Sequence, residues 1–375
     1  MYLQPSRRRT KRNPWPWLLS FAIALSVAWY LYTKQLVILE AVRGPLPTPT
    51  PTEISPREHV AVGDRFFETG QYDDALAEYI RAAEMDPTLA VAYARWGRTL
   101  ALRRQIAEAV RIVRRAVELD AESAENQAYL TMVLDWNGEL ADAMVAGRKA
   151  ITLDPEYALG HAYLAEAYGD YGYIQEAFDA AETAVELDPG DFWVRRNMGY
   201  IYELTAQYEQ AVYEYKAAIE INPYHAFVYL DIGRNYRVLR DWDQSTSYFE
   251  RATQVDPQDP QGYDQLGWTY FAQGLFQPAL TQMEKATQVD PTFAPAFGHL
   301  GTAYYTQRNY EDAITNLHAA IELGARSEDM YYQLGLAYAY TGRCDEAVPW
   351  LEQALLINPD SAIAQRGLAD CRESE

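Results

Sequence analysis

The chain has 375 residues, a length that on its own suggests two or three compact domains, and 49% of them are hydrophobic. It carries 53 acidic residues against 32 Lys and Arg, which gives a formal net charge of -21. Because so acidic a surface repels phosphate backbones, the composition argues against a nucleic acid as partner. The charge is unevenly distributed, since residues 1–52 carry seven Lys or Arg and a single Glu.

The N-terminal region has the composition of a membrane anchor. A basic segment at 1–14 is followed by an uncharged, largely apolar one, and Lys34 is the next charged residue. About 20 apolar residues are needed to cross a bilayer. We therefore predict a basic cytoplasmic tail at 1–14 and a transmembrane signal anchor at 15–39. A cleaved signal peptide is the alternative, although no Ala-x-Ala-type site follows the apolar segment.

The charges around this segment predict its orientation. Five positive charges precede it, and two follow it closely, at Lys34 and Arg43. Because positive charges are retained on the cytoplasmic side, the N-terminus is expected in the cytoplasm and the rest of the chain outside it. Residues 40–55 form a Pro- and Thr-rich linker, a composition that favours an extended polyproline II spacer.

Beyond the linker, the sequence repeats with a period of 34 residues. Prolines mark this period, because they lie 34 residues or a multiple of 34 apart, at Pro87, Pro155, Pro189, Pro223, Pro257, Pro291 and Pro359. The two missing positions are Ala121 and Ala325, so the frame continues without insertion or deletion. A fixed period of this size is the sequence signature of a stacked repeat architecture.

The proline frame divides the sequence into nine units with a shared pattern of small residues. The units are 56–89, 90–123, 124–157, 158–191, 192–225, 226–259, 260–293, 294–327 and 328–361. Their twenty-seventh position is always Ala, and their eighth is Gly except for Thr131 and Ala165. Unit three also departs from the pattern at Gly147, where a large residue is usual.

Within a unit, the apolar residues have helical spacing. Ala211, Tyr215 and Ala218 follow one another at intervals of four and three residues, which places them on one face of a helix. A proline such as Pro223 ends that helix, because proline lacks the N–H group and clashes with the preceding turn. Each unit is therefore predicted to be a helix, a short turn and a second helix, whose apolar face is buried only by stacking on its neighbours.

The pattern Gly199-x-x-Tyr202, followed by Ala211, Ala218 and Pro223, resembles that of the tetratricopeptide repeat family. The resemblance covers 56–361 in nine copies. It implies an all-α fold: a right-handed superhelical solenoid of nine tandem helix-turn-helix repeats, preceded here by the transmembrane helix. Residues 362–375 are predicted to form a capping helix and tail that cover the apolar face of the last repeat.

The chain has two cysteines, Cys344 and Cys371. In the repeat fold, Cys344 opens the second helix of unit nine and Cys371 lies near the end of the cap, so adjacent antiparallel helices would bring them together. Outside the cytoplasm they would form a disulfide that holds the cap to the array. Two free thiols are the alternative.

The sequence predicts no enzyme, no cofactor and no metal site. The five histidines lie in different units at different positions, without ligand spacing to one another or to the cysteines. There is no phosphate-binding glycine loop and no catalytic serine motif, and the repeats leave no room for a catalytic domain.

In the tetratricopeptide family, the first helix of each repeat lines a concave face, chiefly through its second, fifth, ninth and twelfth positions. Mapped onto this sequence, the candidate groove residues are Arg98, Trp193, Arg196, Tyr200, Phe227, Arg234, Arg237, Trp268, Phe271 and Tyr305. Their arginines and aromatic rings suit a peptide with acidic and aromatic side chains. The alternative is that the arginines pair with the protein's own Asp231, Asp264 or Glu203.

The resemblance implies a protein-protein interaction scaffold or assembly factor, tethered to the membrane by its N-terminal helix, that binds proteins or peptides in the concave groove. A second hypothesis is an envelope factor that binds glycans or other polymers on the aromatic groove. A third is a structural spacer. The fold alone does not distinguish these functions.

Overall fold

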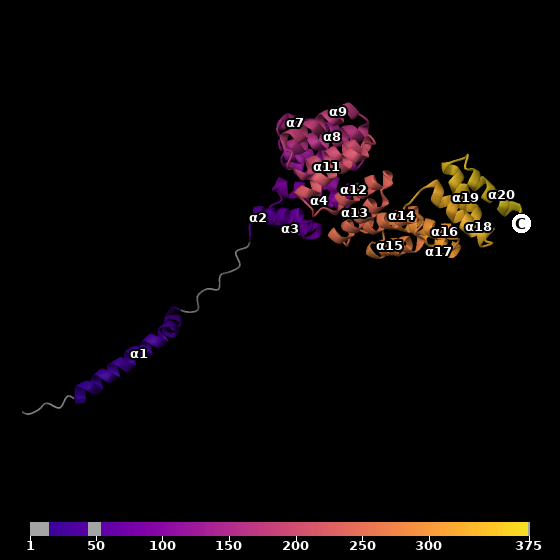
Figure 1. Cartoon of the computed structure of the whole chain (residues 1–375). Helices are drawn as coiled ribbons and strands as arrows, with labels where there is room; N and C mark the ends of the chain where they lie inside the picture. Colours follow the sequence, from indigo (N-terminus) through magenta and orange to yellow (C-terminus); the bar gives the residue numbers. More distant parts are fainter. Residues whose placement is uncertain (1–14, 44–53, 374–375) are drawn as a thin grey trace, which may run out of the picture. The chain divides into compact units, whose positions relative to one another are not determined.

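The computed structural model describes residues 15–43 and 54–373, with side chains described for 15–34 and 54–373, and regular structure there is entirely α-helical (Figure 1). The chain divides into two units, Met1–Ile54 and Ser55–Glu375. The all-α repeat fold predicted from the sequence is confirmed. The predicted basic tail at 1–14 and most of the predicted linker lie outside the described residues.

Among its described residues, the first unit contains one helix, α1 (Trp15–Arg43), which continues past the predicted end of the anchor at residue 39. Its segment Trp15–Lys34 is 20 residues long with a mean hydropathy of 1.3, and none of it is buried. By length and composition this segment could cross a membrane, and a signal sequence near an N-terminus has the same properties.

In its described part, residues 55–373, the second unit has nine helix pairs and a final helix. The first helices of the pairs are α2 (Pro56–Glu68), α4 (Ala90–Leu102), α6 (Ala124–Trp136), α8 (Ala158–Tyr171), α10 (Phe192–Leu204), α12 (Ala226–Val238), α14 (Pro260–Ala272), α16 (Ala294–Thr306) and α18 (Glu328–Tyr340). The second helices are α3 (Tyr72–Met85), α5 (Ile106–Leu119), α7 (Leu140–Leu153), α9 (Ile174–Leu187), α11 (Tyr208–Ile221), α13 (Trp242–Val255), α15 (Phe276–Val289), α17 (Tyr310–Glu322) and α19 (Cys344–Ile357). The final helix is α20 (Ala362–Glu373), which packs on α19 and α18.

Within a pair, the recurring spacing of small and large residues is a steric match between two helices. A Cβ atom at Gly199 would lie 2.8 Å from the buried ring of Tyr215, and one at Gly233 would lie 2.6 Å from Phe249. In repeat three the sizes are exchanged, because Thr131 stands at the glycine position and Gly147 opposite it, where a Cβ atom would lie 3.2 Å from the Thr131 methyl group. The departures in repeat three therefore compensate each other sterically.

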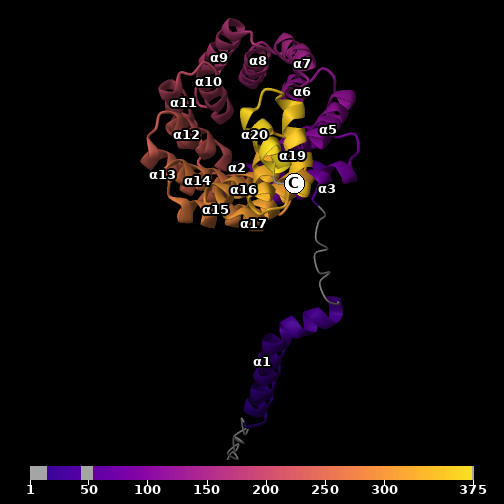
Figure 2. The ribbon, with the colours of Figure 1, turned by 90° about the vertical axis from the view of Figure 1, so that its right-hand side faces the viewer.

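The repeats curve into a coil (Figure 2). The first two repeats contact later ones through side chains. The Tyr72 hydroxyl lies 2.6 Å from Nδ1 of His225, and Nδ2 of Asn222 donates to the backbone oxygen of Glu68 at 3.1 Å. Burial, with Arg98 nearby, lowers the pKa of His225 to about 3, so this imidazole is neutral at pH 7.

Two arginines extend the same contact line. Arg103 lies 3.5 Å from Asp256, and Arg104 lies 3.4 Å from Asp259 and 3.9 Å from Asp290. We call this line the seam: residues 68–72 and 103–104 on one side, and residues 222–225, 256–259 and 290 on the other. The seam joins the two ends of the first turn of the coil. Side chains of the concave face that lie beneath the seam are therefore covered.

Candidate binding groove

Two of the predicted groove residues, Arg98 and Trp193, lie in the interior. Each is 5% exposed. The Arg98 guanidinium lies 3.6 Å from the centre of the Phe67 ring and donates to the Tyr129 hydroxyl at 2.9 Å. Trp193 stacks on Phe227 at 5.3 Å between ring centres and also packs on Phe67. Because the seam closes over them, neither side chain faces an open groove, which corrects that part of the sequence prediction.

Arg196 and Arg234 are paired with carboxylates of the protein itself. Arg196 lies 2.7 Å from Glu166 and 3.8 Å from Asp231, and Arg234 also pairs with Asp231. The Arg196 side chain is only 11% exposed. A buried guanidinium requires a counterion, and Glu166 and Asp231 supply it to Arg196. Both arginines pair with Asp231, one of the internal carboxylates named in the alternative prediction, although the Arg234 side chain is 37% exposed.

Arg237 differs from the other two arginines, because it makes no ion pair with any described residue. Its guanidinium lies 5.6 Å from the centre of the Phe249 ring, and its Nη1 atom is buried without a hydrogen-bond partner. Burial and the neighbouring Arg234 charge lower its pKa. Arg237 is therefore the arginine of the predicted set best placed to accept a carboxylate from a partner.

An acidic cluster lies beside Arg196, and the sequence analysis did not identify it. It contains Asp135 from α6 and Glu166 and Asp170 from α8. Nε1 of Trp136 donates to Glu166 at 3.1 Å, and the Tyr200 hydroxyl donates to Asp170. Asp135 stands at the twelfth position of its repeat, as Phe271 and Tyr305 do in theirs, so the groove positions could have revealed it.

The accessible part of the concave face, in repeats seven to nine, is aromatic. The half-buried ring of Trp268 stacks on Phe271 at 5.1 Å and on His299 at 4.3 Å between ring centres. His299 is held by Asp264, whose Oδ1 atom lies 2.7 Å from its Nδ1 atom. A buried carboxylate thus positions the histidine ring, which in turn supports Trp268.

A second group of aromatic rings, all tyrosines, lies in repeats eight and nine. Tyr305 packs on Tyr310 at 6.0 Å between ring centres, and Tyr310 packs on Tyr340 at 4.9 Å. Burial and the neighbouring tyrosines raise the pKa of Tyr305, so its hydroxyl stays protonated at neutral pH. Tyr340 is 58% exposed and is available to a ligand. We call Trp268, Phe271, His299, Tyr305 and Tyr340 the aromatic surface.

Two cavities lie along the closed part of the coil. The larger, of about 460 Å³, lies at the seam and is lined by Tyr72, Arg103, Arg104, Asp256 and Asp259 among others. The smaller, of about 200 Å³, reaches Trp136, Arg196, Phe227, Leu230 and Arg234. In the described part of the chain, no group of three His, Cys, Asp or Glu is arranged to hold a metal ion.

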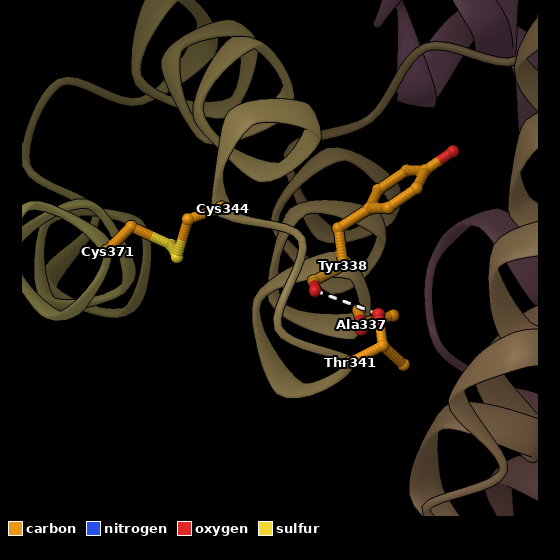
Figure 3. Close-up of a disulfide and its surroundings, with 5 residues drawn as sticks. All are labelled: Ala337, Tyr338, Thr341, Cys344 and Cys371. Carbon is orange, nitrogen blue, oxygen red and sulfur yellow. Dashed lines mark hydrogen bonds between the residues drawn. A yellow bond between two sulfur atoms is a disulfide. The ribbon is translucent and has the colours of Figure 1, made fainter. Parts of the chain in front are cut away.

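At the C-terminal end of the coil, Cys344 and Cys371 form a disulfide between α19 and α20 (Figure 3). Their Cα atoms are 5.3 Å apart, and Cys371 is buried. Close to Cys344, the Thr341 hydroxyl donates to the backbone oxygen of Tyr338 at 2.9 Å and so closes the end of α18. The cap is thus joined covalently to the last repeat.

Known proteins with the same repeats support the family assignment. Family models described as tetratricopeptide repeat match residues 299–362, 332–374, 197–225 and 260–293, and one described as TPR repeat matches 63–102. No curated protein matches the chain in sequence.

Among solved structures, the chain is similar to the APC/C hetero-tetramer Cut9–Hcn1, with a TM-score of 0.63 and 18% identity over 81% of this chain. The chain spans 60% of the length of that protein. It is also similar to the human IFIT1 dimer with PPP-AAAA, with a TM-score of 0.55, 16% identity, and coverage of 92% of this chain and 82% of the other. At such identities the likeness concerns the fold alone. By its repeat pattern, its helix pairs and these matches, the chain belongs to the tetratricopeptide repeat family.

Proposed function

We propose that this protein is a membrane-tethered scaffold or assembly factor that holds a partner protein or peptide on the aromatic surface of repeats seven to nine. The observation that carries the proposal is the row of half-buried rings centred on Trp268 and Phe271 on the concave side. In this proposal the N-terminal helix α1 is a signal anchor, with the N-terminus in the cytoplasm and the repeats outside it.

Half-buried aromatic side chains suit this role for an energetic reason. Trp and Tyr supply a large apolar contact area and lose little conformational freedom when a partner covers them, and they are enriched among the residues that dominate binding energy. Here Trp268 is fixed in advance by its stack on His299, which Asp264 holds. Arg237, whose Nη1 atom has no hydrogen-bond partner among the described residues, adds a site for one acidic group of the partner.

Replacing Trp268 and Phe271 with Ala should abolish partner capture. We expect crosslinking in the native membrane, followed by purification, to recover a specific partner with the wild-type chain and at least tenfold less with the double variant. Each aromatic residue of this kind typically contributes about 2 kcal/mol or more to binding. Tyr213→Ala, which removes a 69% exposed ring from the second helix α11, is the matched control and should capture normally.

Two results would contradict the proposal. Equal capture by the wild type and by a folded Trp268→Ala/Phe271→Ala variant would place the partner on another face. Binding of a glycan by the wild type, lost in the same variant, would favour the polymer-binding alternative, because exposed tyrosines such as Tyr340 also stack on sugars. Circular dichroism of the variant shows whether the repeats remain folded.

A further inference from the structure

A histidine lies at the centre of the seam, enclosed by aromatic rings from both of its sides. His225, in the turn between α11 and α12, is 1% exposed, and its Nδ1 atom lies 2.6 Å from the Tyr72 hydroxyl. The surrounding ring centres lie 5.6 Å away for Phe67, 5.9 Å for Tyr72, 4.5 Å for Phe192, 5.8 Å for Trp193 and 5.8 Å for Phe227. A titratable group thus occupies the contact between repeat one and repeats five and six.

The charge beside His225 is positive, unlike the charge beside two other histidines of the chain. His59 lies 2.5 Å from Glu78, and His299 lies 2.7 Å from Asp264, so that protonation of either ring would complete an ion pair. The charged group that acts on His225 is Arg98, which is itself buried. A proton on His225 would therefore place a second positive charge in the interior next to an existing one.

The closed seam is consequently hostile to a protonated imidazole. Removing the charged ring from water is costly, and aromatic rings attract a cation only weakly in comparison. Burial and the Arg98 guanidinium lower the pKa of His225 to about 3, whereas an imidazole in water has a pKa of about 6.5. Separation of the two sides of the seam would return His225 to water and remove this penalty.

We propose that the seam is an acid-sensitive latch, which is closed at neutral pH and which opens when His225 takes up a proton. Opening would expose Arg98 and Trp193, which occupy groove positions of repeats two and five. Acid would thus uncover a second part of the concave face, apart from the aromatic surface of repeats seven to nine. The inference goes beyond the proposed function, because the latch operates whether or not a partner binds the aromatic surface.

Several other titratable or charged groups face His225 or the seam beside it. They are Glu68 on α2, Tyr72 on α3, Arg98 and Arg103 from α4 and its C-terminal end, Asp191 before α10, Tyr224 next to His225, and Asp256 and Asp259 before α14. Burial raises the pKa of Tyr72, so its hydroxyl stays protonated. Burial also raises the pKa of Asp191 and Asp259, and carboxyl groups that take up a proton more easily in the closed form oppose opening by acid.

The pKa of His225 in the two forms gives the pH range of the latch. A pKa of about 3 in the closed form and about 6.5 in water means that the closed form has its full stability above pH 6.5. It loses this stability progressively as the pH falls from there toward 3. Between pH 7.5 and pH 5, the ratio of open to closed form should rise about thirtyfold.

The test is hydrogen exchange of the full-length protein in detergent at pH 7.5 and pH 5, with each rate divided by the intrinsic rate at that pH. The amides of residues 66–72 and 222–228 should lose about thirtyfold of their protection at pH 5, because their exchange follows the open population. The variant Tyr72→Phe/His225→Phe keeps two rings in place and removes the hydrogen bond together with the titratable group. Its protection should be the same at both pH values.

A matched control removes a histidine outside the seam. Nε2 of His161 lies 2.9 Å from the backbone oxygen of Pro155. Gln127 and Gln365, at the same position of their own units, donate to the corresponding oxygens, so His161→Gln preserves the local contact. This variant should lose protection at pH 5 as the wild type does.

Three results would overturn the proposal. They are equal protection of the wild-type seam at both pH values, the same loss in Tyr72→Phe/His225→Phe, and a loss spread evenly over all nine repeats, which would indicate acid unfolding. If the double variant is already open at pH 7.5, the wild type decides through exchange of the imidazole C2 hydrogen, which reports the pKa of His225. A value well below 6.5 supports the latch, and a value at 6.5 contradicts it.

Discussion

Replacing Gly70 with Ala should open the seam at repeat one, whereas Gly138→Ala should leave it closed. The two glycines occupy the same turn position in repeats one and three, with φ angles of +74° and +79°. Each substitution places an alanine in the left-handed backbone conformation, which costs about 1 kcal/mol or more. At Gly70 alone, the added Cβ atom would also lie 2.3 Å from the backbone oxygen of Tyr224, while no atom lies within 4 Å at Gly138.

Hydrogen exchange measured by mass spectrometry tests this prediction. In Gly70→Ala, the amides of residues 66–72 and 222–228 should both exchange at least tenfold faster, because the Tyr72–His225 and Glu68–Asn222 hydrogen bonds are lost together. In Gly138→Ala, faster exchange should be confined to repeat three. If the amides of residues 222–228 exchange at the same rate in the two variants, the seam does not hold the first repeat in solution.

The seam also determines access to the positions of Arg98 and Trp193 on the concave face. Arg98 and Trp193 are buried against Phe67, which belongs to the first repeat. Opening of the seam would expose them and would convert the first turn of the coil into the open groove that the repeat pattern predicts. The Gly70→Ala variant therefore also tests whether a partner competes with the protein's own first repeat for this surface.

Removal of the disulfide should release the cap from the last repeat. The replacement of Cys344 and Cys371 by Ser is expected to destabilise α20 and repeat nine by about 2–4 kcal/mol, because an unlinked terminal helix has more conformational freedom when detached. Urea titration followed by exchange of the α20 amides measures the change. Reduced wild-type protein is the control, and it should behave as the double variant does.

The same cysteines report the side of the membrane on which the repeats lie. In cells treated with a thiol-alkylating reagent before lysis, an extracytoplasmic domain should show no modification of Cys344 or Cys371 until a reductant is added. Alkylation of both thiols before any reductant is added would contradict both the disulfide in its native environment and the proposed orientation.

Local sequence patterns were sufficient to predict the repeat architecture. Gly199 opposite Tyr215, the invariant alanines and the proline frame act within one repeat or between neighbours, so their consequences can be derived from a single unit. Even the exchange of sizes between Thr131 and Gly147 is visible in the sequence as two departures 16 residues apart, although only the structure shows that they face each other. The proximity of Cys344 and Cys371 follows from the same local geometry.

The accessible part of the groove depended on curvature, which no single repeat encodes. Small rotations between neighbouring repeats accumulate until Tyr72 meets His225, 153 residues later. This closure buries Arg98 and Trp193 and leaves Trp268 and Phe271 on the open side, whereas the counterions of Arg196 come from the two adjacent repeats. The sequence by itself determined the helices, their pairing and the positions that face inward. Only the tertiary structure decided which inward positions form core and which form a binding surface, because that division depends on contacts between repeats distant in the chain.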